Sequence, residues 1–265
     1  MLQMFKALWA FRNFILASIK GELKGRFARS SIGAAWYILQ PMAMAAIMAL
    51  VLSEVLAAKL PGVASKGSYA VYLLAGTTAW GLFAEVTNRC AGVFIEFSSA
   101  LKKISFPRLC LPVIVGGSAL LNHALLLFAV TVVCAVFLDV RPSLAWLALI
   151  PGALLILLFS YGLGVLLGIF NVFSRDVGQF FGIVLQLWFW LTPIVYPPSA
   201  VPASLAWLIE LNPMAPIVAV YQNAILLDAW PDWSTLALPA LVAVSLFGLS
   251  FVVFRRASPE LVDAL

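Results

Sequence analysis

The sequence predicts an all-α integral membrane protein with six transmembrane helices. Of its 265 residues, 64% are hydrophobic and only 10% are charged, whereas soluble domains have about 45–50% and about 25%. Six segments are apolar and nearly free of charge over about 20 residues, the length that a helix needs to cross the hydrocarbon core. A soluble catalytic domain of about 150 residues would not fit beside them, so we expect any energy source to lie in another chain.

The first predicted element is an amphipathic helix at residues 1–29 that lies in the membrane interface. At about 100° per residue its apolar side chains gather on one face, and its cations can reach toward lipid headgroups. A soluble helix packed on a partner is the alternative. The residues that define the predicted interfacial helix are Phe5, Leu8, Trp9, Arg12, Leu16, Ile19 and Lys20.

The predicted spans follow the charge-free runs, at 30–57, 69–97, 109–138, 144–171, 177–196 and 234–254. Prolines 193, 197 and 198 end the fifth span, and the apolar pieces that follow are each too short to cross. Residues 197–230 are therefore predicted to form short re-entrant helices on the outer side. A seventh crossing at 214–230 is the alternative, and it would place Arg255 and Arg256 outside.

The basic residues predict the orientation. With both termini in the cytoplasm, twelve of the sixteen Lys and Arg residues fall in inner segments and three in outer segments, as the positive-inside rule requires. Topology thereby accounts for the net charge of +5, and we expect no nucleic-acid partner. The whole chain, 1–265, is predicted to be one multi-pass membrane domain.

Little in the sequence indicates catalysis or metal binding. No Gly-Lys pair is present for a phosphate-binding loop. Cys90, Cys110 and Cys134 are widely spaced in or beside apolar runs, which indicates neither a disulfide nor a zinc site. His123 has no carboxylate near it in sequence, so we expect it to hydrogen-bond inside the bundle. We expect no catalytic residue, no metal and no cofactor bound by this chain.

Aromatic and polar residues indicate a candidate path for sugars, because the apolar faces of sugars can rest on aromatic rings. Weak, repeated contacts would let a polymer slide. For each tryptophan the alternative is a place in the interfacial aromatic belt, and Glu85 with Arg89 could instead be a structural pair near the inner end of its helix. The candidate path residues are Trp36, Tyr37, Trp80, Phe83, Glu85, Arg89, Trp188, Trp190 and Tyr196.

Two further patterns concern packing and docking. Ser160, Gly164 and Gly168 recur every four residues and predict a close helix–helix seam. In the second cytosolic loop, apolar residues lie between cations, a pattern that favours docking into a partner's cleft over a simple solvated loop; ordinary positive-inside charge is the alternative. The predicted coupling residues are Lys102, Lys103, Ile104, Ser105, Phe106, Pro107 and Arg108.

Several short motifs, in this order, resemble one family. They are Arg26-Phe27 with Ser30, Ile32-Gly33, Trp36, Leu39 and Pro41; Ala75-Gly76 with Trp80 and Phe83; Lys102-Lys103 with Phe106-Pro107-Arg108 and Leu111-Pro112; and Asn212-Pro213. Together they resemble the membrane subunit (permease) of ABC-2-type exporters of O-antigen, capsular polysaccharide and teichoic acid. Phe27 and Ile32 stand where the family commonly has Tyr and Leu.

The resemblance implies a transport subunit and not an enzyme. It implies a homodimer with two copies of a separate ATPase, which would bind ATP and Mg, and export of a lipid-linked, O-antigen-like polysaccharide from the cytoplasm across the bacterial inner membrane. It places the coupling helix at 98–108. A permease for a lipid or drug stays open, as do a secondary transporter and, through Glu210, Asp228 and Asp232 on the outer side, an intramembrane enzyme acting on lipid-linked sugars.

Overall fold

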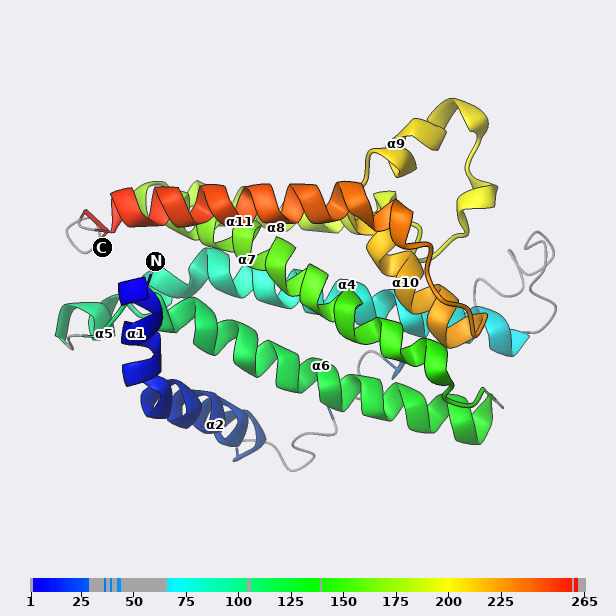
Figure 1. The fold of residues 1–265 in the computed structure, drawn as a ribbon, viewed down its shortest axis with the longest axis horizontal. Coiled ribbons are helices and arrows are strands. Elements are labelled where there is room, and N and C mark those ends of the chain that lie inside the picture. The colour runs from blue at the N-terminus through cyan, green and yellow to red at the C-terminus, as the bar shows by residue number, and fades with distance from the viewer. Residues whose placement is uncertain are drawn as a thin grey trace.

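The computed structural model describes residues 2–28, 36, 39, 42–43, 66–103, 106–138, 140–258 and 260–261. Across these residues every regular element is a helix, and the longest helices lie side by side (Figure 1). The predicted all-α class is confirmed for this part of the chain. The first predicted span, 30–57, lies almost wholly outside the described residues, as does Tyr37.

The N-terminal segment forms two helices, α1 (Leu2–Ala10) and α2 (Arg12–Ala28), with a turn at Phe11. The other α-helices are α4 (Lys66–Glu96), α5 (Ser98–Lys103), α6 (Cys110–Phe137), α7 (Leu149–Phe173), α8 (Asp176–Leu191), α9 (Ala206–Glu210), α10 (Met214–Leu226) and α11 (Ala237–Ala257). Short 3₁₀ turns are η2 (Leu144–Ala148), η3 (Pro198–Ala200), η4 (Ala203–Leu205) and η5 (Trp233–Leu236).

Three helices of the described part are long and apolar enough to cross a membrane: α6, η2 with α7, and η5 with α11. A fourth arises if the pair Ala203–Glu210 and Met214–Leu226, bent by 92°, counts as one broken span. These helices indicate an integral membrane protein. By itself α10 has 13 residues, about 20 Å at 1.5 Å per residue and short of the ~30 Å core.

The core forms around α4, which packs against α6, α7 and α10. Its buried face carries large side chains such as Tyr69 and Phe94. Figure 1 shows the N-terminus, α5 and the C-terminus at one end of the molecule, and α9 at the other end. The chain therefore brings α1, the end of α11 and the segment of the predicted coupling residues to the same end of the bundle. We call this segment, residues 102–108, the docking loop.

The small-residue face of α7 forms a seam within the chain. A Cβ atom at Gly164 would lie 2.7 Å from Cys90 Cβ, and one at Gly168 would lie 2.5 Å from the Cys90 carbonyl oxygen. On the other side of α7, a Cβ at Gly162 would lie 2.6 Å from the backbone nitrogen of Phe247 in α11. The missing side chains thus allow α7 to approach α4 and α11 at backbone distance.

We expect Gly168→Ala to destabilise the chain by about 1–3 kcal/mol, because the added methyl overpacks the α4–α7 contact. The matched control is Gly92→Ala on α4, where an added Cβ meets nothing within 4 Å. That control should be neutral or slightly stabilising. The midpoint of thermal unfolding in detergent measures both, and equal midpoints for the two variants would contradict this seam.

The segment after α8 is held by side chains from two other helices. Tyr69 donates a hydrogen bond to the Val195 carbonyl at 2.7 Å, and Tyr72 donates to the Pro193 carbonyl at 2.8 Å. Gln222 of α10 also donates to Pro193, at 3.0 Å. α8 ends at Leu191, before the predicted limit at 196, and these hydrogen bonds hold the segment that follows against the start of α4 and against α10.

Candidate functional site

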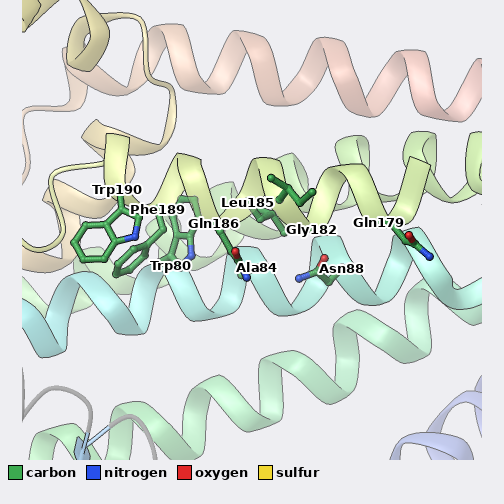
Figure 2. Close-up of a pocket in the computed structure, with 10 residues that line it drawn as sticks. Trp80, Ala84, Asn88, Gln179, Gly182, Leu185, Gln186, Phe189 and Trp190 are labelled. Atoms are coloured by element: carbon green, nitrogen blue, oxygen red, sulfur yellow. The ribbon is translucent and has the colours of Figure 1, made fainter. Parts of the chain in front are cut away.

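A groove with a volume of about 720 Å³ runs between α4 and α8 (Figure 2). Figure 2 shows aromatic rings at one end of it and side-chain amides along the rest. In the described part of the chain, no charged side chain lines the groove. The polar and aromatic residues that line it are Trp80, Asn88, Gln179, Gln186, Phe189 and Trp190.

Helical spacing places these side chains on facing surfaces. On α4, Trp80, Ala84 and Asn88 are four residues apart and share one face. On α8, Gln179, Gly182 and Gln186 are spaced by three and four residues and face α4 in the same way. Trp80 and Trp190 were predicted from the sequence as path residues, but the three amides were not. The four-residue steps from Trp80 to Asn88 on α4 and the seven-residue step from Gln179 to Gln186 on α8 were the signals that could have found them.

A cluster of rings supports the groove from behind. Phe83 has no exposed surface, and its ring centroid lies 5.2 Å from Trp80, 5.3 Å from Trp188 and 5.4 Å from Phe159. Phe83 and Trp188 therefore back the wall and do not line the groove. The indole N–H of Trp188 donates to Asn212 Oδ1 at 2.9 Å, which ties α8 to the Asn212-Pro213 turn.

The polar side chains that line the groove in the described part of the chain are amides and indoles, which suit binding. Amides donate and accept hydrogen bonds with hydroxyl groups, and indole rings offer apolar faces to C–H surfaces. A neutral carbohydrate chain presents both kinds of surface. Tyr196 stands just beyond, with its hydroxyl donating to the Trp190 carbonyl at 2.9 Å. Trp36 is a half-exposed helical residue whose sequence neighbours fall outside the described part.

Glu85 and Arg89 do not reach this groove, because they face α2 and α6. The Arg89 guanidinium donates to both carboxylate oxygens of Glu22, at 2.9 and 2.7 Å, and to Ser118 Oγ at 2.8 Å. Nη1 of Arg89, the nitrogen that donates to Ser118, lies 3.5 Å from Glu85 Oε1, which also accepts a hydrogen bond from Asn122 at 2.9 Å. The structure thus favours the structural-pair interpretation and adds a partner, Glu22.

Sequence reasoning missed Glu22. It is the only acidic residue among the first 53, and an isolated carboxylate in a basic segment was the available signal. The Glu22–Arg89 ion pair is 22% exposed on both sides. It joins the N-terminal helices directly to α4, at the centre of the bundle.

The predicted docking loop lies beside the N- and C-terminal helices. Lys102 and Lys103 at the end of α5 are exposed. The ring of Phe106 lies 5.3 Å from that of Phe14 in α2, and Arg108 donates to Ser258 Oγ at 2.7 Å. Ile104 and Ser105 lie outside the described residues. The loop therefore offers two exposed lysines at its surface, while Phe106 and Arg108 contact other segments of the chain.

Comparison with known proteins decides the family. The model of the ABC-2 type transporter family matches residues 13–226, which contain the groove, the Glu22–Arg89 pair and the docking loop. The chain belongs to the ABC-2 type transporter family. The predicted resemblance is confirmed.

Named relatives of this ABC-2 chain point the same way. Two Klebsiella pneumoniae proteins, each named O-antigen export system permease protein RfbA, are 29% identical to it over 206 residues, 76% of this chain and 76% of theirs. A Myxococcus xanthus protein of the same name is 26% identical over 269 aligned residues, covering 100% of both chains.

The N-terminal helices of the ABC-2 chain have one face packed on the bundle and another face exposed. Trp9 and Leu16 are 72% and 62% exposed, and Lys20 is exposed. Arg12 lies over the Trp9 ring at 5.2 Å. Toward the bundle, Leu8 and Ile19 pack against a small cluster of Ile15, Cys110 and Ile114. The side chain of Phe5 is outside the described part.

Among the described residues of the ABC-2 chain, His123 and the outer acids Asp228 and Asp232 each have a different hydrogen-bond partner. His123 Nε2 lies 2.9 Å from the hydroxyl of Tyr221 inside the bundle. Asp228 accepts a hydrogen bond from Ser143. Hydrogen bonds from Ser234 hold the pKa of Asp232 below its usual value, which disfavours a general acid there. Among the described residues, no three His, Cys, Asp or Glu side chains are placed to hold a metal ion.

Proposed function

We propose that this chain is the membrane-spanning subunit of an ATP-driven exporter of a lipid-linked, O-antigen-like polysaccharide across the bacterial inner membrane. The observation that carries the proposal is the uncharged groove of aromatic rings and amides between α4 and α8. Its chemistry suits a neutral sugar chain held weakly enough to slide. The printed names of the three relatives support the same substrate class.

The proposed exporter is a homodimer of this chain with two copies of a separate ATP-binding subunit. Apolar side chains on the outward face of α8, among them Phe180, Ile183 and Leu187, are each about three-fifths exposed or more. A second copy covering α8 would shield them and close the α4–α8 groove into a conduit. ATP and Mg are bound by the partner subunit, and this chain holds neither.

In the proposed topology both termini and α5 face the cytoplasm, and six helices cross. The exposed cations Lys102, Lys103, Arg255 and Arg256 support this orientation, because they lie on the segments at that end of the molecule. Residues 197–230 then lie at the outer side as re-entrant helices. The 92° bend between the two halves of this region supports that assignment.

The contacts suggest how ATP hydrolysis moves the spans. Closure of the ATPase pair pushes on the 98–108 loop. Phe106 transmits this push to Phe14 of the N-terminal helices. The Glu22–Arg89 pair then carries it to α4, which forms one wall of the groove. This is a rigid-body coupling, with chemistry confined to the partner.

The experiment is co-purification from cells that express the chain with its ATP-binding partner. We expect ATPase activity in the complex and none in the purified chain alone; hydrolysis by the chain alone would refute the proposal.

Lys102→Glu with Lys103→Glu should release the partner and abolish polysaccharide at the cell surface, because the reversed charges repel the docking cleft. Lys24→Glu is the control and should retain both, because Lys24 is an exposed cation on α2 that is not among the residues defining the predicted interfacial helix. Retained partner and polymer in the double variant would refute docking at α5.

A further inference from the structure

A second groove lies on a different face of the bundle, between α1, α6, α7 and α11, with a volume of about 520 Å³. It shares no lining residue with the α4–α8 groove. Its wall is almost entirely hydrocarbon, and the residues used below are Leu8, Phe247, Gly248, Ser250, Phe251 and Val252.

The groove can hold only an apolar occupant along its length. Ser250, one of its few polar side chains, donates a hydrogen bond from its hydroxyl to the Phe247 carbonyl at 2.8 Å. The remaining polar side chain of the wall is Tyr161, so an apolar ligand there would cover at most one hydroxyl that has no hydrogen-bond partner among the described residues. The groove also has unfilled space at Gly248, where a Cβ atom would meet nothing within 4 Å.

One end of the groove is cationic. Arg255 and Arg256 are exposed and lie in the last turn of α11. They follow Phe251 and Val252 by four residues each, and so continue the faces that these groove residues occupy. Among the described residues neither arginine forms an ion pair with a carboxylate. The groove therefore ends at two positive charges that have no acidic partner in the described part of the chain.

We propose that this groove binds one acyl chain of an anionic phospholipid, whose phosphate lies at Arg255 and Arg256. An apolar slot ending at unpaired cations in an integral membrane protein matches a molecule with a hydrocarbon tail and a negative headgroup. Because Leu8 of α1 forms one wall, the lipid joins the N-terminal helices to α11. It is a structural ligand, separate from the exported substrate.

The test uses the full-length chain reconstituted in vesicles of phosphatidylethanolamine with a minority of phosphatidylglycerol, then extracted and examined by native mass spectrometry. We expect the native chain to retain one phosphatidylglycerol. Gly248→Phe should lose most of it, since the ring fills the slot. Leu249→Phe is the matched control on the next residue of α11, which does not line the groove, and it should retain the lipid.

The headgroup is tested separately by Arg255→Gln with Arg256→Gln. We expect the preference for phosphatidylglycerol over phosphatidylethanolamine to fall by about thirtyfold. Each cation contributes a factor of about five, and the two factors multiply. These arginines are exposed, so this variant decides the question even if Gly248→Phe does not fold. Full retention of phosphatidylglycerol by Gly248→Phe, an unchanged preference in the double variant, or retention of phosphatidylethanolamine in its place by the native chain would each overturn the proposal.

Discussion

Replacing Arg89 by Gln should lower the free energy of unfolding by about 3 kcal/mol, the cost of removing one partner from a largely desolvated ion pair. The guanidinium donates to Glu22 and Ser118 and approaches Glu85. Without it, two carboxylates on α2 and α4 lose their cation. Arg89→Lys keeps the charge but has a single nitrogen, whereas Arg89 uses Nη2 on Glu22 and Nη1 on Ser118 and Glu85, so we expect an intermediate loss.

A double-mutant cycle separates this pair from general packing. If the loss arises from an uncompensated Glu22, then Glu22→Gln should recover part of the stability in the Arg89→Gln background, with a coupling of about 0.5–3 kcal/mol. Arg12→Gln serves as the control, because Arg12 contacts only Trp9 among the described residues and is exposed; its effect should be within about 0.5 kcal/mol. Thermal unfolding in detergent measures all four, and strictly additive losses would contradict the pairing.

Gly182→Trp should abolish export of the polysaccharide while the protein still inserts and assembles. Gly182 lines the α4–α8 groove, and an added Cβ there meets nothing within 4 Å. The indole therefore enters the groove without disturbing the packing of the chain, and it occupies the space that we assign to the sugar. We expect most of the surface polymer to be lost.

Gly182→Ala is the matched control, since a single methyl fills little of the groove and supports the helix. It should export normally. Surface polysaccharide is quantified on cells, and the amount of ATP-binding subunit that co-purifies is measured in parallel. Normal polymer from the Gly182→Trp variant would exclude this groove as the path, whereas lost co-purification would mean that the side chain disturbs assembly instead.

Several helices follow directly from local sequence. The charge-free run that ends near Leu138 becomes α6, and the run between Pro142 and Ser174 becomes η2 with α7. Prolines after the fifth span predicted a break, and α8 does end there. These features depend on hydrophobicity, length and proline, each of which acts within a few residues along the chain.

Other features depend on contacts between distant segments. The small-residue spacing on α7 predicted a seam but could not say that α4 and α11 are the partners. Phe83 was a candidate for the sugar path by residue type, yet it is buried behind Trp80. The position of Phe83 in the sequence could not show whether its side chain lines the groove or packs behind the residues that do.

The sequence by itself determined that this is a helical integral membrane protein, because composition and hydrophobic length decide what a bilayer accepts. Only the tertiary structure decided that Arg89 belongs with Glu22, 67 residues earlier, and that the amides of α8 face Asn88 across a groove. Pairings of this kind arise when whole helices pack. Each is decided by the fit and charge of two surfaces, which neither segment encodes alone.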